Sequence, residues 1–522
     1  MTTTAASGRA SGMVPPQLGN LTKLQYLDLS GGIGMYSIDI QWLTHLPSLR
    51  YLDLSSVNLS RISDWPHVMN MNAYLRALHL SGCSLTSASQ SFSLLNFTRL
   101  ENLDLSNNNF NQPLASCWFW YLTSLKYLDL SENNIVGSLP AAVRKFTSLD
   151  TLDLFQNQLT GSVPYEISKL TSLVEINLSL NNLTGEITEE HLAGLKSLKS
   201  INLYPNHYLK IVVFNEWLPP FRLEVAIFES CQLGPMFPSW LQWMVDIKVL
   251  DICYTGITGQ LPHWFWTTLS KATELVLSSN KISGSLPANM ETMSLESLYL
   301  GSNQITGVIP ILPPNLTWLE IQNNMVSGFV ASKTFGAPQL GFMDLSSNNI
   351  KGPIPGSICE LQYLQYLKLA NNHLEGEFPQ CIGMTEVNCL FLNNNSLSSR
   401  VPSFLKGCKQ LQLLDLSQNK FHGRLPSWIG DLPNVERIIL NNNLFSGLIP
   451  TSITNLTNLE HLDLSQNKFH GRLSSWIGNL PAVQILIINN NSFSGHIPTN
   501  ITNLAKLTQL NLANNNISGI LP

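Results

Sequence analysis

The chain has 522 residues, of which only 12% are charged, and its formal net charge is −5. That charged share is about half of the roughly 25% found in typical soluble proteins. So small a charge, without any run of basic residues, argues against nucleic acid and anionic lipid surfaces as partners. No stretch holds the ~18 apolar residues that a membrane span needs. Residues 1–10 are expected to form a disordered tail, and the start lacks the apolar segment of a secretory signal.

A repeat organises the rest of the chain, and residues 411–434, LQLLDLSQNKFHGRLPSWIGDLPN, show it clearly. Their apolar spacing predicts a short strand, a turn and an irregular return, a unit that must stack on copies of itself. The pattern L-x-x-L-x-L-x-x-N recurs about 21 times. It predicts an α/β solenoid of leucine-rich repeats, with a parallel concave β-sheet and an irregular, 3-10 or short-helical convex side. We expect residues 11–522 to form a single solenoid that is truncated within a repeat at both ends.

The Asn that ends each pattern is expected to be buried. A tight bend leaves backbone groups without partners, and an Asn side chain both donates to and accepts from them. This repeated position is called here the Asn column. Cys83, Cys231 and Thr255 occupy it in their repeats and should make weaker hydrogen bonds to the backbone. Gly32 and Val57 have no side-chain group that could make them.

Three regions interrupt the regularity. Residues 60–75 and 207–222 replace the usual return with aromatic, Pro-containing stretches. The step from Asn303 to Asn324 is 21 residues, which leaves no room for a helical return. Residues 414–430 recur almost unchanged at 462–478, which indicates a duplication of two whole repeats. These copies are expected to be scaffold.

Eleven Asn-x-Ser/Thr sequons are candidates for N-glycosylation. An Asn- and Ser-rich repeat generates some sequons by chance, whereas a secreted, glycosylated parent protein would use them. The candidates are Asn20, Asn58, Asn96, Asn177, Asn182, Asn315, Asn394, Asn455, Asn490, Asn500 and Asn516.

The cysteines indicate one candidate bridge. Cys359 and Cys381 lie one repeat apart on the return side, and they either pair in an oxidising compartment or remain free. Cys408 occupies a leucine position, so we expect it in the core. No cysteines and histidines have zinc spacing, and the matching His422 and His470 follow from the duplication rather than from a metal site.

No motif predicts catalysis. The chain lacks a G-x-S-x-G elbow, a phosphate loop and kinase signatures. Acidic residues such as Asp104 and Asp153 recur between the two leucines of the strands. A repeated LDLS motif places an Asp there in each copy, so this recurrence does not indicate a catalytic role. We therefore expect no enzyme, no catalytic residue, no metal and no cofactor.

Aromatic residues gather around the shortened repeat and give the best candidate for a binding surface. They fall at strand positions that face out of the sheet. Exposed aromatic clusters are common binding anchors, although rings also stack along strands for stability alone. The candidate residues are Tyr299, Trp318, Glu320, Phe342, Tyr366 and Phe391.

Most repeats continue as Gly-x-Ile/Leu-Pro, as in Gly137–Pro140 and Gly447–Pro450, and this form resembles the plant extracellular class of leucine-rich repeats. Residues 231–242, 251–266 and 356–381 are similar to plant receptor-like proteins. The resemblance implies a secreted ectodomain on the extracellular side of the plasma membrane, with a membrane span and no kinase domain. It also implies binding of an extracellular peptide, glycan or protein on the concave face, and signalling in defence or development through a partner receptor kinase. The alternatives are a soluble leucine-rich-repeat inhibitor of a cell-wall-degrading enzyme, or a non-functional truncated receptor remnant.

Overall fold

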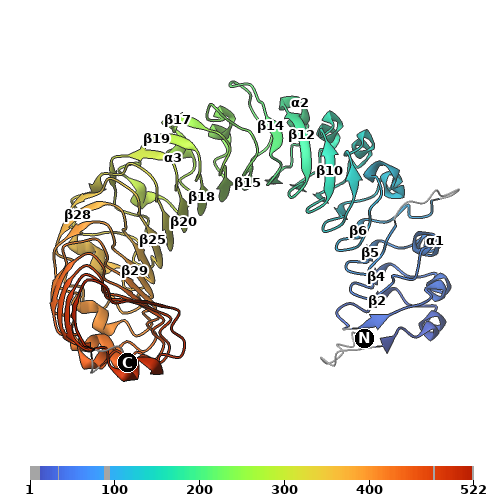
Figure 1. Cartoon of the computed structure of the whole chain (residues 1–522). Coiled ribbons are helices and arrows are strands. Elements are labelled where there is room, and N and C mark those ends of the chain that lie inside the picture. Colours follow the sequence, from blue (N-terminus) through green and yellow to red (C-terminus); the bar gives the residue numbers. More distant parts are fainter. Residues whose placement is uncertain (1–11, 33, 88–94, 474–475, 520–522) are drawn as a thin grey trace. The chain divides into compact units, whose positions relative to one another are not determined.

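The computed structural model describes residues 12–32, 34–87, 95–473 and 476–519. The tail expected at residues 1–10 lies outside these ranges. The chain divides into two compact units, residues 1–257 with 267–269 and residues 258–266 with 270–522, and each is described by itself. Figure 1 labels their strands and helices.

In the first unit, one three-residue strand per repeat joins a parallel sheet, called here the inner sheet. Consecutive strands pair in register, so that Leu27 lies beside Leu52 and Leu52 beside Leu78. The strands are β2 (Tyr26–Asp28), β4 (Tyr51–Asp53), β5 (Ala77–His79), β6 (Asn102–Asp104), β7 (Tyr127–Asp129), β9 (Thr151–Asp153), β11 (Glu175–Asn177), β13 (Ser200–Asn202), β15 (Val225–Ile227) and β16 (Val249–Asp251).

The second unit repeats this arrangement with its own parallel inner sheet. Its strands are β18 (Glu274–Val276), β20 (Ser297–Tyr299), β23 (Trp318–Glu320), β25 (Phe342–Asp344), β27 (Tyr366–Lys368), β29 (Cys389–Phe391), β31 (Leu413–Asp415), β33 (Arg437–Ile439), β35 (His461–Asp463), β37 (Ile485–Ile487) and β39 (Gln509–Asn511). The middle residue of each strand except β39 is buried, and its two neighbours face the other way because strand side chains alternate.

Short outer strands follow the inner ones and pair with their counterparts in the adjacent repeats. In the first unit they are β1 (Gly12–Met13), β3 (Met35–Tyr36), β8 (Val136–Gly137), β10 (Gln158–Gly161), β12 (Asn182–Ile187) and β14 (Tyr208–Ile211). In the second they are β17 (Thr258–Gln260), β19 (Lys281–Ser285), β21 (Gln304–Thr306), β22 (Val308–Ile309), β24 (Gly328–Phe329), β26 (Lys351–Gly352), β28 (His373–Gly376), β30 (Ser396–Leu397), β32 (His422–Gly423), β34 (Leu444–Gly447), β36 (Lys468–Arg472), β38 (Ser492–Gly495) and β40 (Asn516–Ile517).

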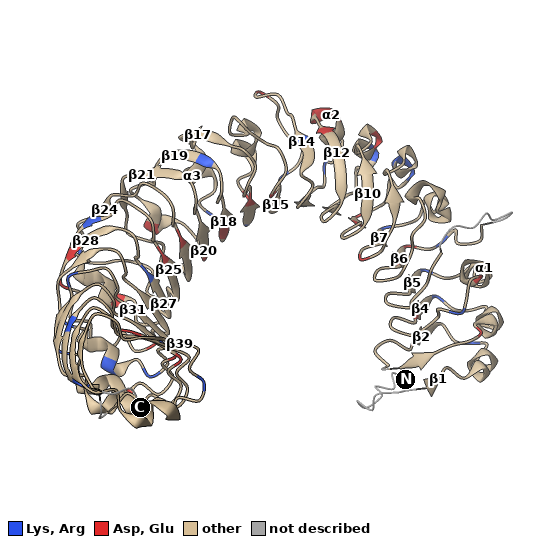
Figure 2. Cartoon of the chain, in the orientation of Figure 1, with Lys and Arg blue, Asp and Glu red and all other residues tan. Residues whose placement is uncertain are grey.

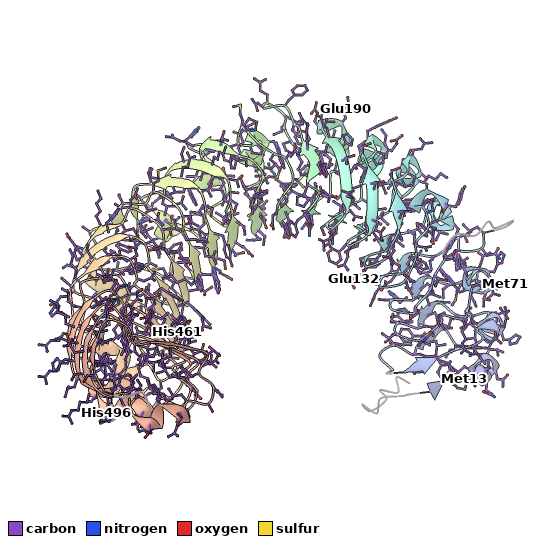
Figure 3. The ribbon with its side chains drawn as sticks, viewed as in Figure 1. Met13, Met71, Glu132, Glu190, His461 and His496 are labelled. Carbon is purple, nitrogen blue, oxygen red and sulfur yellow. A yellow bond between two sulfur atoms is a disulfide. The ribbon has the colours of Figure 1, made fainter. Side chains whose placement is uncertain are left out.

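The return of most repeats is one turn of 3-10 helix that begins after a proline. These helices are η1 (Pro16–Asn20), η2 (Gln41–His45), η3 (Leu114–Ser116), η4 (Trp118–Tyr121), η5 (Ala141–Lys145), η6 (Tyr165–Lys169), η7 (Ser239–Trp243), η8 (Met290–Thr292), η9 (Gly356–Glu360), η10 (Ser403–Gly407), η11 (Ser427–Asp431), η12 (Thr451–Asn455) and η14 (Thr499–Asn503). The α-helices are α1 (Trp65–Asn70), α2 (Glu189–Leu192) and α3 (Phe265–Thr268). In the first unit, Figure 3 shows Met71 and Glu190 on the outer side and Glu132 on the inner side. The predicted repeat fold is confirmed.

The buried Asn column works as predicted. The Asn108 amide nitrogen donates to the carbonyl oxygens of Leu80 (2.8 Å), Leu105 (3.1 Å) and Ser106 (2.9 Å), and its amide oxygen accepts from the Leu85 N–H (2.9 Å). One side chain therefore ties its own turn to the preceding repeat. Cys83 makes the weaker substitute contact, with its thiol 3.1 Å from the Leu54 carbonyl oxygen.

The residue immediately before this column has a left-handed backbone conformation in most repeats, which the sequence analysis missed. Asn107, Leu180 and Tyr254 have φ values of 50°, 51° and 56°. Asn and Gly adopt this conformation readily, but Leu and Tyr do so at a cost. The turn geometry therefore overrides local preference in those repeats.

The predicted irregular regions behave differently from one another. Residues 60–75 contain α1, whereas residues 207–222 contain β14 and then no helix. As predicted, no helix occupies residues 307–317 of the shortened repeat, where β22 pairs instead with β24.

Candidate functional site

The predicted aromatic residues of the second unit form a continuous row across its inner sheet. Tyr299, Trp318, Phe342 and Tyr366, called here the aromatic ladder, come from β20, β23, β25 and β27. Strand register sets their order, because Ser297 pairs with Trp318, Trp318 with Phe342 and Phe342 with Tyr366. The ladder therefore crosses four adjacent repeats.

The rings contact one another in sequence. Trp318 and Phe342 stack with their centroids 4.0 Å apart and their planes 1° apart. Tyr366 is tilted against Phe342 at 5.6 Å, and Tyr299 against Trp318 at 6.4 Å. Phe342 is only 8% exposed, so the expectation of an exposed ring is wrong at this position. The rings of Trp318 and Tyr366 cover Phe342, and these two rings are themselves half-buried.

Glu320 is held in place by the ladder itself. The Trp318 indole N–H donates to one carboxylate oxygen of Glu320 (2.8 Å), and the Gln322 amide donates to the other (3.2 Å). The indole is thereby fixed in orientation, which lowers the entropy that it loses when a ligand binds.

Lys368 is a functional candidate that the sequence analysis missed. Its ammonium lies 4.9 Å from the centre of the Phe342 ring and 6.0 Å from that of Phe391. It also lies 3.4 Å from a carboxylate oxygen of Asp344, whose side chain is 10% exposed. Lys368 therefore connects Phe391 to the ladder through cation–π contacts. Its position in the same strand slot as Glu320 is the signal that would have identified it.

The first unit carries a second row of rings that the sequence analysis also missed. Tyr26 and Tyr51 stack at 4.2 Å, and His79 is tilted against Tyr51 at 5.4 Å. The His79 imidazole lies 3.6 Å from a carboxylate oxygen of Asp104. This pairing raises the pKa of His79 although burial opposes the change. For Asp104, burial raises the pKa, but hydrogen bonds from His79 and Ser106 outweigh it and leave the pKa lowered.

The candidate glycosylation sites differ in accessibility. Asn96, Asn177 and Asn500 are partly buried, and the Asn177 amide nitrogen donates to Asp153 on the inner sheet (3.1 Å). The remaining candidates have exposed side chains: Asn20, Asn58, Asn182, Asn315, Asn394, Asn455, Asn490 and Asn516.

Cys359 and Cys381 form a disulfide with their α-carbons 4.9 Å apart, which links η9 to the return of the next repeat. Cys408 is fully buried, as its leucine position indicated. Among the described residues, no helix is long and apolar enough to cross a membrane.

Comparison with known proteins identifies the repeat class. A leucine rich repeat family model matches residues 98–159, 314–374 and 425–469, and a second one matches residues 294–316, 410–432, 482–504 and 506–522. Receptor-like protein EIX1 of Solanum lycopersicum is 40% identical over 131 residues, 25% of this chain and 13% of that receptor. Receptor-like protein 41 of Arabidopsis thaliana is 29% identical over 374 residues, 61% of this chain and 41% of that receptor.

The chain is a leucine-rich-repeat protein, and it is similar to plant receptor-like proteins. It spans less than half the length of these relatives. The solved plant peptide hormone receptor RGFR1, in complex with RGF2, has a TM-score of 0.80 at 26% identity, over 98% of this chain and 86% of that one. The Arabidopsis receptor kinase HAESA ectodomain, in complex with an IDA peptide hormone, has a TM-score of 0.76 at 27% identity, over 95% of this chain and 79% of that one.

Proposed function

We propose that the chain is a ligand-recognition segment of a plant receptor ectodomain, and that the aromatic ladder of the second unit contacts an extracellular peptide or a peptide segment of a protein. The observation that carries this proposal is the half-buried, pre-oriented Trp318, whose indole N–H donates to Glu320 and whose stacking partner Phe342 lies beneath the Lys368 ammonium. Rigid aromatic anchors with polar neighbours are typical of recognition surfaces.

The ring geometry favours a peptide over a glycan at this surface. Sugar rings bind aromatic side chains by lying on their faces. One face of Trp318 is already covered by Phe342 at 4.0 Å, and Lys368 lies over the Phe342 ring. The half-buried rings with charged groups beside them suit apolar and charged side chains of an extended peptide.

We further propose that the full-length parent protein lies at the plasma membrane with these repeats outside, and that it signals through a partner receptor kinase. The support is the class of the relatives and the structure of HAESA with the peptide hormone IDA and the co-receptor SERK1, which has a TM-score of 0.68 at 25% identity. We propose a binding role and no catalytic one.

Selection from a random-peptide phage library on the secreted chain tests the ladder. The enriched peptides should carry apolar residues, and their binding to Trp318→Ala should weaken by about tenfold or more, the usual cost of removing an aromatic anchor. Tyr363→Ala is the matched control, because it removes an exposed ring elsewhere on the second unit and should leave binding unchanged. Peptides that bind Trp318→Ala as tightly as the wild type would overturn the proposal.

A further inference from the structure

Basic side chains lie in and beside the outer strands of the second unit. Arg400, Arg424 and Arg472 occupy equivalent positions in three repeats, and all three are exposed. The row, called here the basic strip, also includes the exposed residues Lys420, His422, Lys468, His470 and His496. Figure 2 shows Lys and Arg along the outer side of this unit beyond β28. One repeat separates Arg400 from Arg424, and two repeats separate Arg424 from Arg472, with the exposed Leu448 at the equivalent position between them. The strip is therefore not a basic run in the sequence.

Glycines hold the arginine side chains flat against the outer sheet. A β-carbon added to Gly447 would lie 2.8 Å from Cγ of Arg424, and one added to Gly423 or Gly495 would lie 3.3 or 3.5 Å from Cγ of Arg400 or Arg472. The aliphatic stem of each arginine therefore runs over the glycine of the following repeat. This arrangement orients the guanidinium groups along the stacking direction, with adjacent repeats about 5 Å apart.

No acidic side chain neutralises the strip on its own strands. The strands β30, β32, β34, β36, β38 and β40 contain no Asp or Glu. Within the described ranges, Arg400, Arg424 and Arg472 make no ion pair. Guanidinium groups bind carboxylates with two parallel hydrogen bonds, and no carboxylate of the described residues pairs with these groups.

An open groove of about 900 Å³ lies at the start of the strip. Arg400, His422 and Arg424 line it together with Trp428, which is half-buried. Ser399, Ser403 and Ser446 add hydroxyl groups, and Glu377 is the one acidic residue among the lining side chains that the structure describes. An aromatic ring beside cationic groups and hydroxyls is the set of contacts that an acidic sugar requires.

We propose that the basic strip and its groove bind a linear acidic polysaccharide that carries one carboxylate on each sugar. The guanidinium groups of Arg400 and Arg424, in adjacent repeats, match two carboxylates of such a chain, and Arg472 continues the row two repeats further on. A single phosphate does not supply two such groups. Trp428 stacks on a sugar ring. The hydroxyls of Ser399 and Ser403 donate to the Arg400 carbonyl oxygen and to Gln380, so their oxygens accept hydrogen bonds from sugar hydroxyls. The site lies on the outer strands, so it is independent of the peptide proposed for the inner sheet.

The test measures binding of de-esterified polygalacturonate fragments to the full chain by biolayer interferometry. The double variant Arg400→Gln/Arg424→Gln should bind at least about tenfold more weakly, because two charge-assisted contacts are lost. Lys281→Gln/Lys333→Gln is the matched control: it removes the same charge from exposed sites elsewhere on the second unit and should change affinity less than about twofold.

Two further comparisons separate this site from general attraction of polyanions. Fully methyl-esterified fragments should fail to bind, and Trp428→Ala should weaken binding of the acidic fragments but not of dextran sulfate. Thermal unfolding of each variant confirms that the chain is still folded. Equal binding of the methyl-esterified fragments, or equal weakening by the control pair, would overturn the proposal. Dextran sulfate that binds as tightly as polygalacturonate and is weakened equally by Trp428→Ala would also overturn it.

Discussion

The rings of Trp318 and Phe342 lie parallel, with their centroids 4.0 Å apart, yet only Phe342 is almost completely buried. The two residues therefore contribute differently. Phe342→Ala should destabilise the second unit by about 3 kcal/mol, as expected for truncation of a buried Phe, and Trp318→Ala should cost clearly less. Urea unfolding followed by circular dichroism measures both. Equal loss of stability would show that Trp318 is structural rather than available to a ligand.

The Asn column predicts a large difference between two adjacent asparagines. Asn108→Ala leaves the Leu85 N–H and the Leu80 carbonyl without their partner, and each unsatisfied buried group costs about 1–3 kcal/mol. Asn109 is exposed, and its amide oxygen accepts from the Asn134 side chain. Asn109→Ala should therefore change the unfolding free energy by less than about 1 kcal/mol. The unfolding midpoints of the two variants check this order, which a comparable shift in both would contradict.

The His79–Asp104 pair predicts stability that depends on pH. The raised pKa of His79 stabilises the fold below its ordinary value of 6.5, and that contribution is lost as the pH rises through the folded-state pKa. The lowered pKa of Asp104 stabilises above its ordinary value of 3.8 and is lost on acidification through its own folded-state pKa. The pair should thus contribute most between these two values.

Thermal unfolding of the wild type and His79→Gln at about pH 5.5 and about pH 8 measures this effect. The variant should lower the melting temperature more at the acidic pH, where the wild-type imidazole is charged. His373→Gln, at an exposed position for which no ion pair is found in the described part of the chain, is the control and should show no such difference. If His79→Gln lowered the melting temperature equally at both pH values, the His79–Asp104 pair would not be the source of the pH dependence.

The Cys359–Cys381 disulfide closes a loop with a sequence separation of 22 residues. Cys381→Ser should lower stability by about 3 kcal/mol, mostly because the unfolded chain gains freedom. Cys389→Ser is the control, since Cys389 is a free, half-buried thiol. Urea unfolding with and without a reducing agent measures the contribution of the disulfide. Reduction should destabilise the wild type and leave the stability of Cys381→Ser unchanged.

Repeat spacing was enough to predict that Trp318, Phe342 and Tyr366 lie in one row. Parallel strands that pair in register place equivalent residues of adjacent repeats side by side. Repeat spacing could not predict the burial of Phe342. That burial comes from the side chains around the ring: Trp318 and Tyr366 contact it from the equivalent position of the adjacent repeats, and Lys368 lies over it from another position.

The left-handed residue before the Asn column was missed for a different reason. At Leu180 and Tyr254 the residue type argues against that conformation, and only the hydrogen bonds of the finished turn impose it. The basic strip was missed because its members are far apart in the chain. Only the stacked repeats bring Arg400 and Arg424 together.

The near-identity of residues 414–430 and 462–478 has a consequence for engineering. In the structure, β32 and β36 take equivalent places, and each pairs in register with the strands beside it. A cassette of two whole repeats can therefore be inserted or removed without changing the junctions on either side. The length of the outer surface can therefore be varied by design. Each added cassette supplies one more Lys-x-His-x-Arg sequence and leaves the rest of the chain unchanged.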